Sequence, residues 1–154
     1  MQFLRTYGIC YHLLMDQKVL AILNKERSSA LSISLLDGSP HTACMAFGYK
    51  ENPFEILFLT DRKSKKCEPL LKGLSAKASF VVGFDEADMV TLQIDGEIKI
   101  EEDRGKIEEI RKIYFEKYPD HRRYENEGSR YLVFVPLWSR YTDFKPVPNL
   151  VITS

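Results

Sequence analysis

The chain has 154 residues, and its 22 Lys and Arg are balanced by 22 Asp and Glu, so its formal net charge is zero. This balance argues against proteins that bind nucleic acids or anionic membranes, because both partners attract a net positive charge. A hydrophobic fraction of 44% is too high for a disordered protein, and the length is typical of a single domain over residues 1–154.

The N-terminal segment and the cysteines indicate the cellular compartment of the protein. Residues 1–14 are apolar but interrupted by Arg5 and His12, lack a signal-peptide cleavage site, and are too short to span a membrane. We interpret them as an N-terminal extension. The cysteines, Cys10, Cys44 and Cys67, are odd in number and irregularly spaced, which predicts neither a disulfide framework nor a zinc site. We therefore expect a cytoplasmic protein with reduced thiols and no membrane partner.

The first half of the chain begins with a helix and continues as strands. Residues 15–27 carry apolar side chains at helical spacing after Asp16, a good N-cap. In residues 30–36 the apolar side chains alternate with serines, which predicts a half-buried strand, and Asp37-Gly38 then signals a hairpin turn. Further strands are expected over residues 41–49 and 55–60, followed by a short helix over 67–74 and a strand over 77–84.

The second half gives the clearest strand pattern. Residues 90–101 alternate strictly, and Gly96 falls on their apolar face, where a bulge or sharp bend is expected. The longest helix is predicted over residues 103–118, followed by a charged loop, strands over 131–135 and 138–144, and a tail over 145–154. Strands dominate and the helices lie at connections, so the pattern predicts a mainly β fold, a small antiparallel barrel of six or seven strands with peripheral helices.

The sharpest local feature is the basic segment TDRKSKK, residues 60–66. It places four cations and two hydroxyls at the end of a predicted strand and the start of a predicted helix. Side chains of this kind beside a helix N-terminus are suited to binding a phosphate group. The alternative interpretation is a solvated charged turn in which Ser64 only caps the helix.

Several segments in this order resemble the pyridoxamine 5′-phosphate oxidase-like family of FMN-binding split-barrel proteins. They are LSISLLDGSPHTACMAF from Leu31, ILFLT ending at Thr60, SKK from Ser64, TLQIDGEIKI from Thr91 and WSRYTDF from Trp138. The resemblance covers most of residues 15–144. Two cations that the family pattern places on the second strand are replaced here by Thr42 and Phe47, and the family's Arg-x-His substrate motif is not found, so that family's named reaction is not assigned.

The resemblance implies a homodimer that binds FMN at the subunit interface. Its phosphate would be held by Thr60, Ser64, Lys65 and Lys66, and its ring would lie along the second strand. Trp138 could stack near the flavin from the partner subunit, or could equally be part of the core of the dimer interface. The implied cofactor-binding residues are Thr42, Ala43, Met45, Phe47, Leu59, Thr60, Ser64, Lys65, Lys66, Thr91 and Trp138.

The function expected from this resemblance is a flavin-dependent oxidoreductase acting on an unidentified small molecule. The alternatives are a non-enzymatic flavin- or haem-binding protein related to stress, and a reductase that uses the deazaflavin F420. No catalytic pair and no metal site are predicted. We expect Cys44 to be a buried filler and Cys67, close to lysines, to be the more reactive thiol.

An excess of apolar side chains in residues 131–141 predicts that the chain self-associates. Residues 131–135 are apolar on both faces, and Trp138 and Tyr141 follow closely. A small barrel has too little interior for all of them, so we expect some to pack across a symmetric interface.

Overall fold

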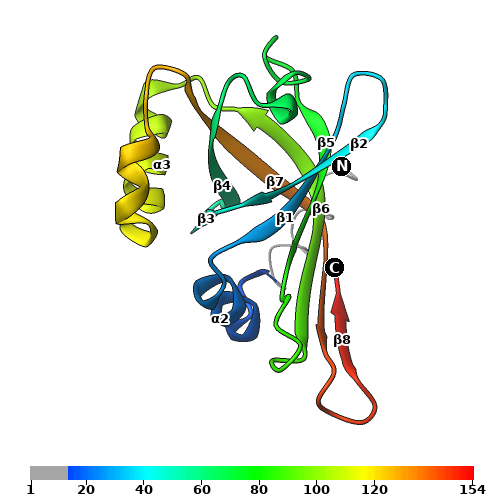
Figure 1. The fold of residues 1–154 in the computed structure, drawn as a ribbon. Helices are drawn as coiled ribbons and strands as arrows, with labels where there is room; N and C mark the ends of the chain where they lie inside the picture. Colours follow the sequence, from blue (N-terminus) through cyan, green and yellow to red (C-terminus); the bar gives the residue numbers. More distant parts are fainter. Residues whose placement is uncertain (1–13) are drawn as a thin grey trace.

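The computed structural model describes residues 14–154, which form a strongly curved antiparallel sheet with helices beside it (Figure 1). Arg5, Cys10 and His12 of the expected N-terminal extension lie outside the described residues. In chain order the elements are α2 (Gln17–Lys25), β1 (Ser29–Ser34), β2 (Pro40–Met45), β3 (Gly48–Glu51), β4 (Phe54–Asp61), the 3-10 turn η1 (Lys65–Cys67), β5 (Ala76–Val82), β6 (Val90–Ile100), α3 (Arg104–Lys117), the 3-10 turn η2 (Pro119–Tyr124), β7 (Ser129–Asp143) and β8 (Leu150–Thr153).

The sheet is closed by one bent strand. Along the sheet the order is β2-β1-β5-β6-β7-β4-β3, so β2 and β3 lie at opposite ends although only Ala46 and Phe47 separate them in the chain. The single strand expected over 41–49 is therefore present but sharply bent at these two residues. Counted as one strand, it gives six barrel strands, with β8 added outside on β7. The predicted mainly β barrel is confirmed.

Tyr118, the residue that follows α3, fixes the bend between β2 and β3. Its hydroxyl accepts the N–H of Phe47 at 3.3 Å and lies 2.9 Å from the Phe47 carbonyl oxygen. The same hydroxyl lies 2.7 Å from the Arg27 carbonyl oxygen. These contacts satisfy backbone groups that the bend removes from the ladder. The Phe47 ring can thus enter the barrel core without leaving buried polar groups unpaired.

Gly96 produces the expected irregularity in β6. The register between β6 and β7 shifts between Asp95 and Gly96, and Gly96 then lies opposite Pro136. A Cβ atom at position 96 would meet the Val135 carbonyl oxygen at 2.1 Å, so only glycine fits. The expected pair of strands over 131–135 and 138–144 is wrong, because β7 runs unbroken from Ser129 to Asp143. Pro136 has no N–H to donate, but it lies at the bulge, where the ladder is already interrupted.

The interior of the barrel is packed with aromatic and aliphatic side chains from all of its strands. Phe47, Phe58, Phe80 and Phe134 are fully buried, and the Phe80 ring contacts the other three at centroid distances of 5.0, 6.2 and 6.4 Å. The apolar stripe of α2 covers one end of this core with Val19, Leu20, Ile22 and Leu23. The helix expected at 15–27 is confirmed, and Asp16 caps it by accepting the Lys18 N–H at 2.8 Å.

Helix α3 covers the outside of the barrel over β4 and β7. Ile110 packs with Leu57, Tyr131 and Val133 in a second cluster. Leu132 and Phe134, on the other face of β7, belong to the barrel core. Over residues 131–135 the two apolar faces of β7 are therefore both covered within the chain. The expectation that this surplus needs a symmetric partner is wrong at residues 131–135, because the sequence pattern does not show that α3 lies against this strand.

Two further segments differ from expectation. The residues expected to form a helix over 67–74 form only the 3-10 turn η1 and further turns, and Pro69 lacks an N–H there. The tail expected over 145–154 contains β8, which pairs with β7 from Arg140 to Asp143. Among residues 14–154 no helix is long and apolar enough to cross a membrane.

Candidate functional site

Two hydroxyls and an ammonium group converge where β4 ends. Thr60 is the next-to-last residue of β4, and Ser64 immediately precedes η1. The Thr60 and Ser64 hydroxyl oxygens are 3.1 Å apart, and the Lys66 ammonium donates to the Thr60 hydroxyl at 3.3 Å. All three side chains are partly exposed. We call Thr60, Ser64 and Lys66 the β4-end cluster. It presents polar hydrogens to one small volume, which is the arrangement that an anion requires.

The turn that holds this cluster is tied together by short-range hydrogen bonds. The Asp61 carboxylate accepts the Lys63 N–H at 2.7 Å, and the Asp61 carbonyl accepts the Ser64 N–H at 3.0 Å. The Cys67 thiol lies 3.5 Å from both the Asp61 carbonyl oxygen and the Ser64 hydroxyl. The expected helix N-terminus is absent from this segment, so its N–H groups and dipole contribute nothing here. The anion-binding capacity rests on side chains.

Lys65 lies near a different loop from Lys66. The turn after β1 holds Asp37, whose pKa is lowered mainly by hydrogen bonds from Ser39 and to a smaller extent by the nearby Lys65 ammonium. Neither Lys65 nor Lys66 forms an ion pair with a carboxylate within the described part of the chain. No described carboxylate therefore competes with an external anion for either cation.

Strand β2 divides the residues expected to line a flavin ring. Thr42 points to the outer face of the sheet, where its hydroxyl lies 2.7 Å from that of Ser32. Ala43 and Met45 point inward, and Phe47 lies in the core with its backbone groups bound to Tyr118. The structure does not bring Phe47 to the surface. Because β2 pairs only with β1, half of its backbone N–H and C=O groups face away from the ladder and can bind a ligand.

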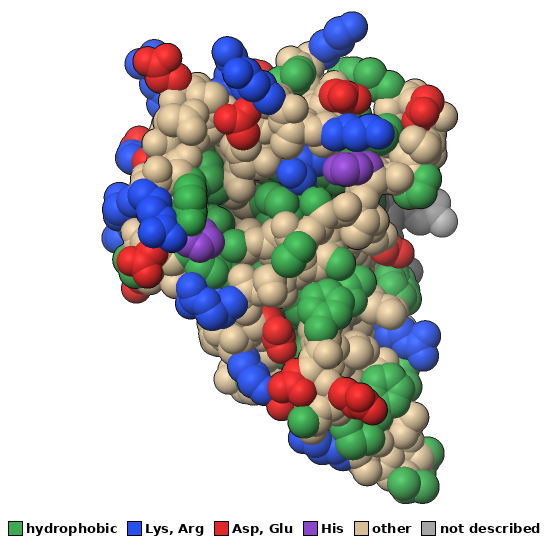
Figure 2. Space-filling view, viewed as in Figure 1, with side chains coloured by type: hydrophobic (Ala, Val, Ile, Leu, Met, Phe, Trp, Pro, Cys, Tyr) green, Lys and Arg blue, Asp and Glu red, His purple; other side chains and the backbone are tan. Residues whose placement is uncertain are grey.

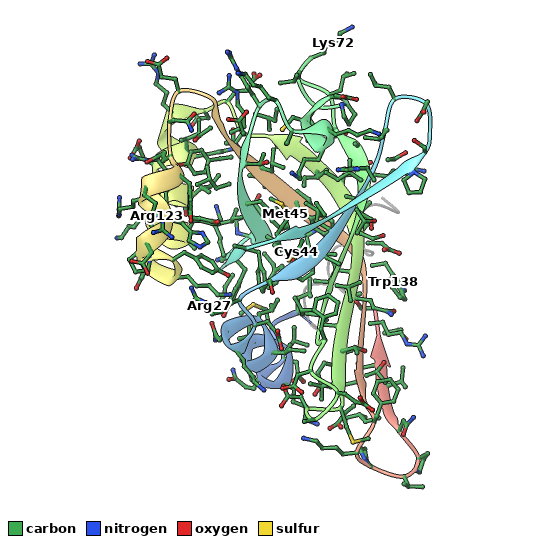
Figure 3. The ribbon with its side chains drawn as sticks, in the orientation of Figure 1. Arg27, Cys44, Met45, Lys72, Arg123 and Trp138 are labelled. Atoms are coloured by element: carbon green, nitrogen blue, oxygen red, sulfur yellow. The ribbon has the colours of Figure 1, made fainter. Side chains whose placement is uncertain are left out.

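The two described cysteines have the opposite exposure to that expected. Cys44 is exposed, whereas Cys67 is completely buried against the turn. Figure 3 labels Cys44 beside Met45, and Met45 is 8% exposed, as the alternation of a strand requires. The expectation of a buried Cys44 is wrong. It was based on the usual burial of cysteine, whereas the alternation of β2 turns this side chain to the outer face of the sheet. The expectation of a reactive Cys67 is wrong because the thiol has no access to solvent.

Thr91 and Trp138 do not join the β4-end cluster within one chain. Thr60 pairs with Arg130 near one end of β7, and Thr91 pairs with Thr142 near its other end. Trp138 pairs with Asp95 on the outer face of β6 and β7 and is 37% exposed. In Figure 3 Trp138 and Arg123 of η2 lie on opposite sides of the molecule. Thr91 or Trp138 could therefore reach a ligand bound at β4 only from a second copy of the chain.

Leu59 and Thr60 also line a hollow of about 210 Å³ between β4, α3 and η2. Its wall contains an aromatic group that the sequence analysis missed, formed by Tyr114, His121 and Tyr124. The Tyr114 hydroxyl lies 3.0 Å from His121 Nδ1, and the His121 ring stacks on Tyr118 with a centroid distance of 4.8 Å. On the face drawn in Figure 2, Lys, Arg and His side chains gather around the upper half of the molecule.

The electrostatics of this hollow keep its aromatic groups neutral. Burial, with smaller effects from Arg27 and Arg123, lowers the pKa of His121, so its ring is uncharged at neutral pH. Burial raises the pKa of the Tyr114 hydroxyl, which therefore keeps its proton. The one signal in the sequence was the spacing of Tyr114, Tyr118 and His121 along and just beyond the helix. Nothing local indicated that η2 folds back onto β4.

Comparisons with known proteins place the chain by its fold. No protein-family model matches the sequence, and no curated protein matches it. Solved structures do match. A conserved hypothetical protein from Mycobacterium tuberculosis has a TM-score of 0.70 at 20% identity, with 87% of this chain and 88% of that one covered. A protein related to general stress protein 26, of the pyridoxine phosphate oxidase family, from Clostridium acetobutylicum has a TM-score of 0.65 at 15% identity, covering 92% and 94%.

A haem-binding protein from Mycobacterium smegmatis also shares the fold, with a TM-score of 0.68 at 11% identity over 86% of this chain and 54% of that one. Identities of this size show the fold alone. The chain therefore has the split-barrel fold of the pyridoxamine 5′-phosphate oxidase-like proteins, and the resemblance expected from the sequence is confirmed at this level.

Proposed function

We propose that this chain binds FMN and acts as a flavin-dependent oxidoreductase on a small molecule. The observation that carries the proposal is the β4-end cluster, in which Thr60, Ser64 and Lys66 meet although the sequence alone allowed a plain charged turn. The split-barrel fold supports it, because the resemblance in residues 31–100 implies FMN binding in this part of the barrel.

The donor set of the cluster fits a phosphate monoester. Two hydroxyls can donate hydrogen bonds to its oxygens, while Lys66 and, across the turn, Lys65 balance its two negative charges. The unpaired backbone edge of β2 offers N–H and C=O groups to a planar, hydrogen-bonding ring. Thr60, Ser64, Lys65 and Lys66 would hold the phosphate, and the β2 backbone near Ala43 would orient the ring.

Bound FMN would supply hydride or single-electron transfer, the chemistry for which no protein side chain is suited. The contribution of the chain is to bind, to orient and to exclude water. The neutral His121 and the protonated Tyr114 line the hollow next to Thr60. They can donate or accept hydrogen bonds to a polar small molecule placed there without adding a charge.

The direct test is the absorption spectrum of the purified protein. The two-band spectrum of oxidised flavin, lost on adding NADH or NADPH under anaerobic conditions, is the expected result. A Soret band instead would favour the second candidate, a haem-binding protein, for which the fold of the M. smegmatis protein is a precedent and the partly exposed His41 on β2 is the candidate ligand. A protein that takes up neither cofactor when each is added would contradict both.

We also propose a homodimer, formed through the outer face of β1, β2, β5 and β6. Ser32, Thr42 and Ser79 place small side chains on this face, and Trp138 lies at its border. A shallow groove of about 360 Å³ lies on the same face, lined by Ser32, Ser79 and Asp95 among others. A second copy seated here would also bring a Trp138 toward a ligand that the first copy binds.

Sedimentation velocity at micromolar concentration should therefore give twice the chain mass of 17.9 kDa. Replacing Ser32 by arginine should shift the equilibrium to monomer, because it puts a long cation at the proposed interface, beside the groove that Ser32 lines. The matched change of the exposed loop residue Ser75 to arginine should leave the dimer intact. A clean monomer for the unmodified chain would contradict the dimer and the contribution of Trp138 from the partner.

A further inference from the structure

Lys117, at the end of α3, has an environment unlike that of any surface lysine. Its ammonium nitrogen lies 3.9 Å from the centroid of the Phe47 ring and 5.5 Å from that of Tyr118. Its hydrogen-bond acceptor is the Leu23 carbonyl at 2.9 Å, close to the end of α2. The side chain is half-buried where α2, α3 and the β2–β3 bend meet. No pattern in the sequence marks Lys117 as a functional residue.

The charges around this amine disfavour its protonated form. Within the described residues Lys117 forms no ion pair with a carboxylate. The guanidinium of Arg27 lies nearby, donating to the Lys117 carbonyl at 3.5 Å and stacking 4.7 Å from the centroid of the Tyr118 ring. Burial and, secondly, Arg27 lower the pKa of Lys117 to about 8, while Glu26 opposes this only weakly. A lysine that is desolvated and close to another cation is the form that acts as a nucleophile in proteins.

Lys117 is one of the residues that line a groove on the surface of the barrel. The groove has a volume of about 600 Å³ and lies between α2, β3 and α3. Its lining combines apolar surface with hydrogen-bonding and charged groups, and comprises Asn24, Gly48, Tyr49, Lys50, Glu51, Ile113 and Glu116 besides Lys117. The Tyr49 hydroxyl donates to the Asn24 side chain at 3.0 Å, so the Asn24 amide remains free to donate. The groove is open to solvent, and its volume is large enough for a compact amphipathic ligand.

We propose that Lys117 is a covalent binding site for small aldehydes or ketones in this groove. The ammonium first loses its proton to solvent, and the neutral amine then attacks the carbonyl carbon. A carbon–nitrogen double bond forms, the carbonyl oxygen leaves as water, and no electrons are exchanged with an outside reagent. The site lies on a different part of the barrel from the β4-end cluster, so this proposal stands whether or not the chain binds FMN.

Reductive trapping tests the proposal on the full-length protein. The protein is incubated at pH 7.5 with a limiting concentration of butanal and cyanoborohydride, which converts an imine to a stable secondary amine, and the modified lysines are mapped by peptide mass spectrometry. An amine with a pKa of about 8 is neutral in a fraction about 200-fold larger than an ordinary lysine at this pH. Partial burial reduces access, so we expect Lys117 to be modified at least tenfold faster than the exposed Lys112 of the same helix.

Two variants sharpen this result. Lys117→Arg keeps the positive charge but cannot form an imine, so the rapid modification should disappear. Lys112→Arg, one turn earlier on α3, should leave it unchanged. Thermal melts of both variants verify that they are folded. Equal modification rates of Lys117 and Lys112 in the unmodified chain would overturn the proposal, as would rapid modification that persists in Lys117→Arg.

Discussion

Changing both Lys65 and Lys66 to alanine is expected to weaken FMN binding at least tenfold. Each lysine would make a charge-assisted hydrogen bond to a dianionic phosphate, worth about 1.5–3 kcal/mol. A loss of about 1.4 kcal/mol is a factor of ten in the dissociation constant, so tenfold is the lower bound. The single changes should differ, with Lys66→Ala the larger, because Lys66 contacts Thr60 directly while Lys65 lies toward Asp37. Fluorescence titration at fixed salt measures the constants.

Riboflavin and a second double variant serve as controls. Riboflavin lacks the phosphate, so its affinity should be the same for the unmodified chain and the Lys65→Ala/Lys66→Ala variant. Changing Lys72 and Lys112, both exposed, removes the same net charge away from the β4-end cluster and should leave FMN binding within about twofold. In Figure 3 Lys72 extends outward from the top of the molecule. Equal FMN affinity in the unmodified chain and in both double variants would contradict the phosphate site and indicate that residues 60–66 are an ordinary solvated turn.

The features that the sequence predicted well are those fixed by near neighbours in the chain. The strict alternation of residues 90–101 defined β6, and Gly96 on its apolar face marked the bulge that the register of β6 and β7 contains. The N-cap of the first helix was equally readable, since Asp16 accepts the Lys18 N–H two residues later. Such signals depend on a few residues and change little with tertiary context.

The features that were missed depend on contacts between distant segments. Nothing within residues 131–135 shows that α3 lies on one of their faces, so their apolar character was assigned to a partner subunit. The bend at Phe47 is set by Tyr118, 71 positions away in the chain. Residues 136 and 137 were left between two predicted strands, yet they belong to one strand, because the register shift opposite Asp95 and Gly96 accommodates them.

The same division applies to the candidate site. Thr60, Ser64 and Lys66 were predicted because they lie within one short segment, and the structure brings their side chains together. The helix dipole expected beside these residues is absent, because Pro69 and the 3-10 geometry of η1 prevent a helix from forming there. His121 and Tyr124 were missed because η2 reaches β4 through the packing of α3, a tertiary contact.

Replacing Phe80 by alanine is expected to cause the largest loss of stability of any single change considered. Phe80 is completely buried on β5, and its ring lies edge-on to Phe47, with Phe58 and Phe134 also in contact. Removing a buried phenyl ring costs about 3–5 kcal/mol, because the surrounding side chains fill the cavity only in part. For a chain of this length that is a fall in Tm on the order of 10 °C. Chemical denaturation with guanidinium chloride measures the free energy directly.

The matched control is Phe84→Ala, four residues further along the chain, where the side chain is 59% exposed. This change deletes the same atoms from a site that buries little apolar surface, and should alter the free energy of unfolding by no more than about 0.5 kcal/mol. Because both variants remove the same phenyl ring, the difference between their unfolding free energies reports the effect of burial alone. Because the Phe80 ring borders Phe47 at the bend between β2 and β3, its loss should also loosen the closure of the barrel. Similar unfolding free energies for Phe80→Ala and Phe84→Ala would contradict the central position of Phe80 in the core.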